Sequence, residues 1–299
     1  MSKRIVVVGS SNTDMIIKCQ RIPGPGETIL GGEFFKIAGG KGANQAVAAA
    51  RAGGEVEFIG CVGKDSMGQE ALQGLSNEGI DVSHVKISPD KASGIALINV
   101  ADSGENSITV ASGANTEIFP EDVLALEDVI LSADIILLQH EIPFETVTKV
   151  IELAHKKSVP VILNPAPAAP VHADLLDKIY LMTPNEHEAA LIAEMQGESD
   201  PHILADALLE MGCDQLIITI GDKGALYASG KERIVVEVER VDAVDTTAAG
   251  DTFNGYLAVA LAGGKDIREA IRIANKAASL SVTRLGAQAS IPGIDELKL

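Results

Sequence analysis

The chain has 299 residues, of which 46% are hydrophobic and 22% are charged, close to the composition of ordinary globular proteins. Its formal net charge of -18 repels nucleic acids and anionic membrane surfaces at long range, so both kinds of partner are disfavoured. No stretch approaches the ~20 apolar residues of a membrane helix, and the N-terminus lacks the apolar core of a signal peptide. We therefore expect a cytoplasmic protein with reduced thiols at Cys19, Cys61 and Cys213.

Short runs rich in Val and Ile predict buried parallel strands, and residues with helical spacing lie between most of these runs. Strands are expected at 4–9, 56–61, 134–138, 159–164, 178–182 and 215–220. Helices are expected at 43–52, 66–77, 120–131, 144–157, 186–195, 201–211, 249–262 and 266–284. Strands that alternate with helices in this way predict an α/β fold, in which helices cover both faces of a parallel sheet.

Two segments interrupt this alternation. Residues 19–37 are rich in Gly and Pro, and residues 93–110 alternate apolar and polar side chains around the turn ADSGEN. Because each segment is too short to fold alone, we predict that they form one small antiparallel sheet, a lid built from about 15–38 and 93–112. A β-extension with no lid role is the alternative.

An antiparallel edge of the main sheet is expected near the C-terminal third of the chain, at 224–228 and 233–238. The sequence shows no repeat, low-complexity tract or linker. We therefore expect residues 1–299 to form one domain that carries the lid.

The stretch DTTAAGDTFNG, at 245–255, places small residues immediately before a predicted helix. The first turn of a helix leaves several N–H groups without partners, so Ala248, Ala249 and Gly250 are predicted to form an anion hole. Asp251 would then lie beside a transferring phosphoryl group and could accept a proton from an attacking hydroxyl. The alternative is that Asp251 only caps the helix.

A glycine-rich turn at 39–42 also opens a predicted helix, and Lys41 and Asn44 offer donors and acceptors suited to sugar hydroxyls. Asn12 and Asp14 follow the first predicted strand, at the edge where α/β sheets bind ligands, and could hold vicinal hydroxyls. Both features also have structural explanations. Gly-rich turns often serve geometry alone, and Asx residues after a strand often make local turns.

Asn185 and Glu188 lie one turn apart in TPNEHE and could orient Mg²⁺ and its waters. They could equally form an N-cap and a first-turn acid. The sequence contains no P-loop, no G-x-G-x-x-G after a strand and no G-x-S-x-G nucleophile elbow, and its six His residues lack metal-binding spacing. These observations disfavour the common nucleotide-binding and hydrolase classes.

Taken together, two stretches resemble the ribokinase family of sugar and nucleoside kinases, which is also named for a minor phosphofructokinase. They are GGKGANQAVAAARAGGEVEFIGCVGKD at 39–65 and AVDTTAAGDTFNGYLA at 243–258, within a similarity that runs nearly end to end. The resemblance implies a three-layer α/β/α domain with a mainly parallel central sheet and a small antiparallel β lid. It also implies phosphoryl transfer from ATP with Mg²⁺ to a sugar hydroxyl, with Asp251 as the base.

Within the family, Ala248-Ala249, GGKGANQA and the tail VTRLGAQAS are similar to members that phosphorylate D-ribose at O5 to D-ribose 5-phosphate. Deoxyribose, fructose and nucleosides are the alternative substrates. A non-catalytic sugar-binding regulator is a further alternative, which the intact Gly250 and Asp251 disfavour.

The resemblance assigns a role to each matching position. The residues implied to hold the sugar are Asn12, Asp14, Gly40, Lys41, Gly42, Asn44, Glu141 and Asp251. Those implied to bind the nucleotide are Asn185, Thr219, Gly221, Gly224, Gly250 and Asn275. A monovalent cation, usually K⁺, is implied at Asp245, Thr247, Ser281, Arg284, Gly286 and Ser290. A homodimer joined through the lid is also implied.

Overall fold

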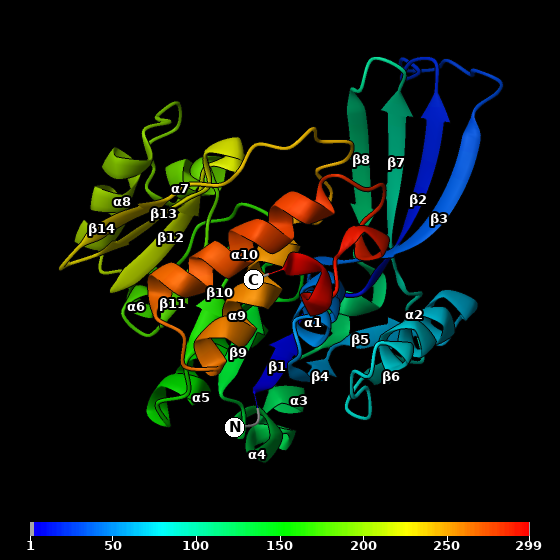
Figure 1. Cartoon of the computed structure of the whole chain (residues 1–299). Helices are drawn as coiled ribbons and strands as arrows, with labels where there is room; N and C mark the ends of the chain where they lie inside the picture. The colour runs from blue at the N-terminus through cyan, green and yellow to red at the C-terminus, as the bar shows by residue number, and fades with distance from the viewer. Residues whose placement is uncertain (1–2, 299) are drawn as a thin grey trace.

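The computed structural model describes residues 3–298 and contains one large central sheet (Figure 1). Its eight strands have the order β14-β13-β12-β11-β10-β9-β1-β4. In chain order they are β1 (Arg4–Val8), β4 (Glu55–Ile59), β9 (Ile135–Leu138), β10 (Val161–Leu163), β11 (Leu181–Met182), β12 (Gln215–Thr219), β13 (Ala225–Ser229) and β14 (Arg233–Val236). Neighbouring strands in the series β4-β1-β9-β10-β11-β12 pair in parallel. Strands β13 and β14 form the predicted antiparallel edge.

Helices cover both faces of this sheet, so the predicted three-layer α/β/α class is confirmed. Successive residues of a strand point to opposite faces, and in β1 the side chains of Ile5 and Val7 join one hydrophobic cluster while Val6 and Val8 join the other. One face carries α1 (Lys41–Arg51), α2 (Ser66–Asn77), α9 (Ala249–Ala262) and α10 (Ile267–Ser281). The other carries α3 (Pro120–Ala125), α4 (Glu127–Ile130), α5 (Phe144–Lys156), α6 (Ala173–Leu176), α7 (Glu186–Ile192) and α8 (Pro201–Glu210).

Two predicted elements are interrupted in the structure. The strand expected at 56–61 ends at Ile59, where Gly60 packs so tightly that an added Cβ would lie 2.6 Å from the Gly9 carbonyl oxygen. The chain then bends, and β5 (Cys61–Gly63) pairs with β6 (Lys86–Ser88) in a separate sheet. The helix expected at 120–131 breaks at Leu126, where no Gly or Pro signals the break. The short helix α6 was not predicted.

A four-stranded sheet projects from the domain at the upper right of Figure 1. Its strands are β2 (Asn12–Cys19), β3 (Glu33–Gly39), β7 (Gly94–Ala101) and β8 (Asn106–Ala111), in the order β3-β2-β7-β8. This lid sheet brings together the two segments predicted to form it. Within 19–37, however, β2 ends at Cys19 and regular strand resumes only at Glu33, and β2 starts earlier than expected, at Asn12.

The lid sheet is antiparallel only in its two outer pairs. Strands β2 and β7 pair in parallel, because both leave the domain and run outward before their partners return. The prediction of a wholly antiparallel arrangement was therefore wrong for this central pair. Alternation of apolar and polar residues identifies a strand but carries no information about its direction. Within residues 3–298, no helix is both long and apolar enough to cross a membrane.

Candidate active site

Asp251 lies in the first turn of α9, which follows Ala248 in a left-handed conformation with φ 60°. Its side chain is buried, and both carboxylate oxygens accept hydrogen bonds from α1. Asn44 Nδ2 donates to Oδ2 across 3.0 Å, and Gln45 Nε2 donates to Oδ1 across 3.1 Å. The carboxylate is thus oriented by another helix and does not cap its own.

Close packing of two helices makes these contacts possible. A Cβ added at Gly255 of α9 would lie 2.4 Å from Ala48 Cβ and 2.7 Å from Ala49 N of α1. Only a glycine therefore permits this approach. The small residues of both predicted motifs serve the same junction, which brings Asp251 to Asn44 although the two are 207 positions apart.

Three carboxylates interact with the Lys41 ammonium group or with one another near the first residue of α1: those of Asp14, Glu141 and Asp251. Glu141 Oε2 accepts hydrogen bonds from Lys41 N at 2.9 Å and from Ser10 Oγ at 2.5 Å. Burial raises the pKa of Asp14 from 3.8 to about 6, and the negative charges of Glu141 and Asp251 add to this increase. Burial lowers the pKa of Lys41, but Asp251 and Glu141 outweigh burial and raise it overall. Lys41 therefore remains a cation among these carboxylates.

Asn12 and Asp14 lie on β2 where this strand leaves the domain, and both are buried. Asn115 Nδ2 donates to Asn12 Oδ1 across 2.7 Å, while Asn115 Oδ1 accepts from Ser11 N. The amide nitrogen of Asn12 is consequently the end left to face a ligand. A Cβ at Gly40, whose φ is 89°, would lie 2.6 Å from Asn12 N, so this turn must pass close to β2.

A cavity of about 200 Å³ joins the start of α9 to residues from three strand ends. Its lining includes Lys41, Asn164, Asn185, Glu188, Thr219, Thr246, Ala248, Ala249, Gly250 and Asp251. The predicted anion hole, the base and the two residues predicted to act on Mg²⁺ therefore surround one space. Gly250 leaves this side open, since an added Cβ there would meet no atom within 4 Å.

Asn185 and Glu188 take the capping role that was one of their two predicted alternatives. They form a capping box at α7, in which Asn185 Oδ1 accepts from Glu188 N and Glu188 Oε2 accepts from Asn185 N, both at 2.8 Å. Both residues also line the cavity beside Asp251. Burial raises the pKa of Glu188. Across residues 3–298, no three or more His, Cys, Asp or Glu side chains are grouped as a metal site.

A second cavity, of about 250 Å³, continues from Thr246 and Ala249 along α10. Gly221 and Asn275, both predicted to bind the nucleotide, line it, whereas Gly224 does not. Gly224 instead allows β13 to pass β14, because an added Cβ would lie 2.1 Å from the Val236 carbonyl oxygen. Asn275 Nδ2 donates to that same carbonyl at 2.9 Å.

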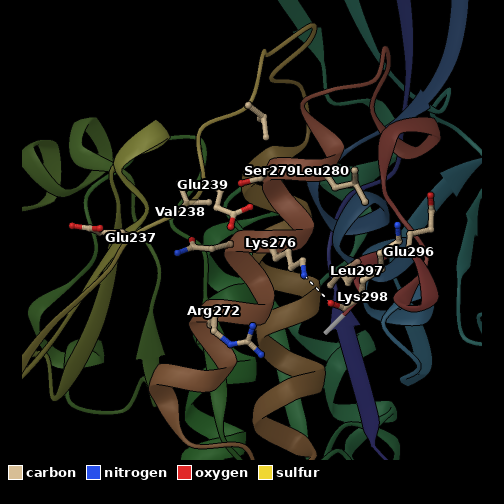
Figure 2. Close-up of a pocket in the computed structure, with 12 residues that line it drawn as sticks. Glu237, Val238, Glu239, Arg272, Lys276, Ser279, Leu280, Glu296, Leu297 and Lys298 are labelled. Atoms are coloured by element: carbon tan, nitrogen blue, oxygen red, sulfur yellow. Dashed lines mark hydrogen bonds between the residues drawn. The ribbon is translucent and has the colours of Figure 1, made fainter.

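Figure 2 shows a larger cavity of about 490 Å³, which is lined in part by residues of α10. Arg272, Lys276 and Lys298 contribute side chains here, and Lys276 Nζ donates to the Lys298 carbonyl across 3.0 Å. Asn275 alone among the predicted site residues lines it. The cavity shares five lining residues with the second cavity, namely Val238, Glu239, Val241, Asn275 and Ser279, so the two cavities adjoin each other beside α10.

The two loops predicted to hold a monovalent cation are in contact. Asp245 Oδ2 accepts from Gly286 N at 2.9 Å, and Asp245 Oδ1 accepts from Thr247 N at 2.9 Å and from Thr247 Oγ1 at 2.6 Å. Ser281 and Ser290 lie close to Gly286 in the sequence, and both are buried. Each hydroxyl, however, donates to a backbone carbonyl of its own turn. The Arg284 side chain pairs with Glu296.

Several residues of the site were not predicted: Ser10, Gln45, Asn115 and Asn164. Asn164 lines the cavity, and the other three contact the predicted residues through their side chains. Ser10 contacts Glu141, and Asn115 contacts Asn12. Gln45 lies within the motif at 39–65 and Ser10 lies two positions before Asn12, so proximity could have identified these two, whereas no motif lies near Asn115 or Asn164.

The model of the pfkB family of carbohydrate kinases matches residues 2–294 of the chain. The chain belongs to this family. The predicted family and the predicted enzyme class, carbohydrate kinase, are thereby confirmed.

Individual members of the pfkB family are similar over nearly their full length. Ribokinase of Bacillus subtilis is 42% identical, with 99% of this chain and 98% of that protein covered. Deoxyribokinase of Salmonella typhimurium is 36% identical, covering 98% and 96%. The structure of Arabidopsis thaliana ribokinase complexed with ribose and ATP superposes with a TM-score of 0.91 at 32% identity, covering 100% of this chain and 98% of that one.

Proposed function

We propose that the chain catalyses ATP-dependent phosphorylation of D-ribose at O5, giving D-ribose 5-phosphate. The observation that carries this proposal is the position of Asp251. Its oriented carboxylate lies at the start of α9 and lines the same cavity as Lys41 and Gly250, and its charge also acts on Asp14. Similarity to ribokinases, one of them complexed with ribose and ATP, supports the choice of substrates.

In the proposed reaction, the hydroxyl at C5 gives its proton to Asp251 as O5 forms a bond to the γ-phosphorus of ATP. The bond from that phosphorus to the bridging oxygen breaks, and ADP leaves. The N–H groups at Ala248–Asp251 and the Lys41 ammonium stabilise the negative charge on the transferring group. Asn12 and Asp14 orient the sugar through its other hydroxyls.

Metal ions complete the proposal. Mg²⁺ carried by ATP would neutralise phosphate charge, and the oxygens of Asn185 and Glu188 beside the cavity fit its preference for oxygen ligands and bound water. A monovalent cation such as K⁺ would fit the loops joined by Asp245 and Gly286, whose backbone carbonyls and side-chain oxygens are hard donors. It would stiffen the anion hole without touching the substrate.

We also propose a homodimer joined through the lid sheet. Register places Ile16, Phe35, Ile98 and Ile108 across one face of this sheet, next to the row that contains Asp14. Ile108 is 55% exposed and Phe35 is 40% exposed, which is unusual for large apolar side chains on a strand. The same face of a second copy would cover them.

A coupled assay of ADP release across D-ribose, 2-deoxy-D-ribose, D-fructose and adenosine tests the proposed substrate. We expect the highest kcat/KM with D-ribose, and NMR of the product should show the phosphate on O5. A higher value with another sugar would assign the chain to that alternative activity. Sugar binding without ADP release from any of the four would identify a regulator and refute the kinase proposal.

A further inference from the structure

Two side-chain amides of α1 hold Asp251, but only one of them can also reach the sugar. Asn44 belongs to the residues expected to contact substrate. Gln45 has no exposed surface, so it reaches the reacting atoms only through its 3.1 Å hydrogen bond to Asp251 Oδ1. Any contribution of Gln45 to the reaction is therefore an effect on Asp251.

The surrounding contacts allow the Gln45 amide a single orientation. Its Nε2 also donates to Asn164 Oδ1 across 3.1 Å, and its Oε1 accepts from Gln139 Nε2 across 2.7 Å. Asn164 is fixed in turn, because its Nδ2 donates to the Thr183 carbonyl at 3.0 Å. A reversed Gln45 amide would place its oxygen against two acceptor oxygens and its NH₂ against that of Gln139.

We propose that Gln45, oriented by Gln139 and Asn164, is a positioning residue that keeps the Asp251 carboxylate aligned and ready to accept a proton. This inference rests on the role of Asp251 in the proposed function. The side chains of Gln45 and Gln139 are fully buried, so solvent cannot replace either amide as a donor. Gly9 provides the space for Gln139, because an added Cβ there would lie 2.3 Å from Gln139 Oε1.

The charge balance at Asp251 gives Gln45 a measurable effect. Burial and the negative charge of Glu141 raise the pKa of Asp251, while Lys41 and the hydrogen bonds from Asn44 and Gln45 act in the opposite direction. Loss of the Gln45 donor would raise the pKa further, since one interaction that favours the charged form disappears. Less of the base would then be ionised at any pH on the acidic side.

The test is the pH dependence of the single-turnover rate for wild type, Gln45→Met and Gln139→Met, with the sugar that wild type phosphorylates best. For Gln45→Met we expect the acidic limb to move to higher pH by about one unit, with the sugar KM within about threefold of wild type. For Gln139→Met, which removes the donor to Gln45 Oε1 but keeps the hydrogen bond from Gln45 to Asp251, we expect a smaller move in the same direction.

Thr146→Val is the matched control. Thr146 is also fully buried, and its Oγ1 donates to the Ile118 carbonyl at 2.7 Å, remote from Asp251 in the hydrogen-bond network. This variant should lose stability and keep the wild-type pH profile. A Gln45→Met profile that superposes on wild type, or a change in KM alone, would overturn the inference.

If Gln45→Met does not fold, the Gln139→Met profile decides in the same way. The wild-type measurements separate this inference from the proposed function. A wild type that phosphorylates none of the sugars refutes the function itself. An active wild type with an unshifted Gln45→Met refutes only the role of Gln45.

Discussion

The central sheet and the lid sheet differ in what covers them. Every residue of β9 is buried, because helices of the same chain cover both faces, whereas every residue of β8 is exposed. The lid strand β2 is buried in one part and exposed in another, since Asn12 and Asp14 are buried at its start and Ile17 is exposed further out. The chain completes the central sheet by itself, and the lid requires something more, which we propose to be substrate and a second copy.

Asp251→Asn tests the part of the site that the helices on the central sheet provide, and it should have the largest effect on activity. Asn keeps the size of the side chain but cannot accept the proton, so we expect kcat to fall at least ~100-fold while KM changes by less than about tenfold. Steady-state kinetics and calorimetric binding of sugar and ATP would measure both. A folded variant with nearly normal kcat would place the base elsewhere.

Asp14→Asn tests the buried start of the lid. Loss of a charged acceptor should weaken sugar binding by about 10–100-fold, measured by calorimetry. The variant should nevertheless be more stable. Because the pKa of Asp14 is about 6 in the folded protein and 3.8 ordinarily, ionising this carboxyl opposes folding above pH 6.

The gain in stability should therefore depend on pH. At pH 7.5 we expect the Tm of Asp14→Asn to exceed that of wild type by about 2–4 °C. As the pH falls from about 6 toward 4, the wild-type carboxyl becomes protonated in the folded protein and the difference should shrink. An unchanged or lower Tm at pH 7.5 would show that Asp14 carries no such cost.

Replacement of K⁺ by a large organic cation tests the loops behind the anion hole. At constant ionic strength and Mg²⁺, we expect kcat to fall by about 3–10-fold, less than the 10²–10³ that loss of a direct oxyanion donor costs. Asp245→Asn, which weakens the contact between the loops, should respond less to the exchange. Equal wild-type rates in both salts would remove this role.

Ile108→Glu tests whether a second copy covers the lid, and it should affect kcat least. A charge on the apolar face should convert a dimer into a monomer of 31.1 kDa, measured by light scattering. Ser107→Glu, on the opposite face of the same strand, is the control and should remain dimeric. A wild type that is itself monomeric, or an Ile108→Glu dimer, would contradict the proposed interface.

The sequence predicted the central sheet well because its strands depend on local hydrophobic runs, as in residues 4–9 and 215–220. It also indicated that Asp251, Lys41 and Asn185 share a site, since small residues and helix starts mark their motifs. It could not show that Asn115 fixes Asn12, because these residues are 103 positions apart and meet only through the fold. The direction of β2 against β7 was inaccessible for the same reason.

Strand β2 continues without a break from Asn12 to Cys19. The part proposed to choose the sugar and the part proposed to join two copies are therefore one rigid piece of backbone. A chimaera that exchanges whole lids between family members would transfer sugar preference along with assembly. To separate these two properties, the crossover would have to fall inside β2, after Asp14 and before Ile16.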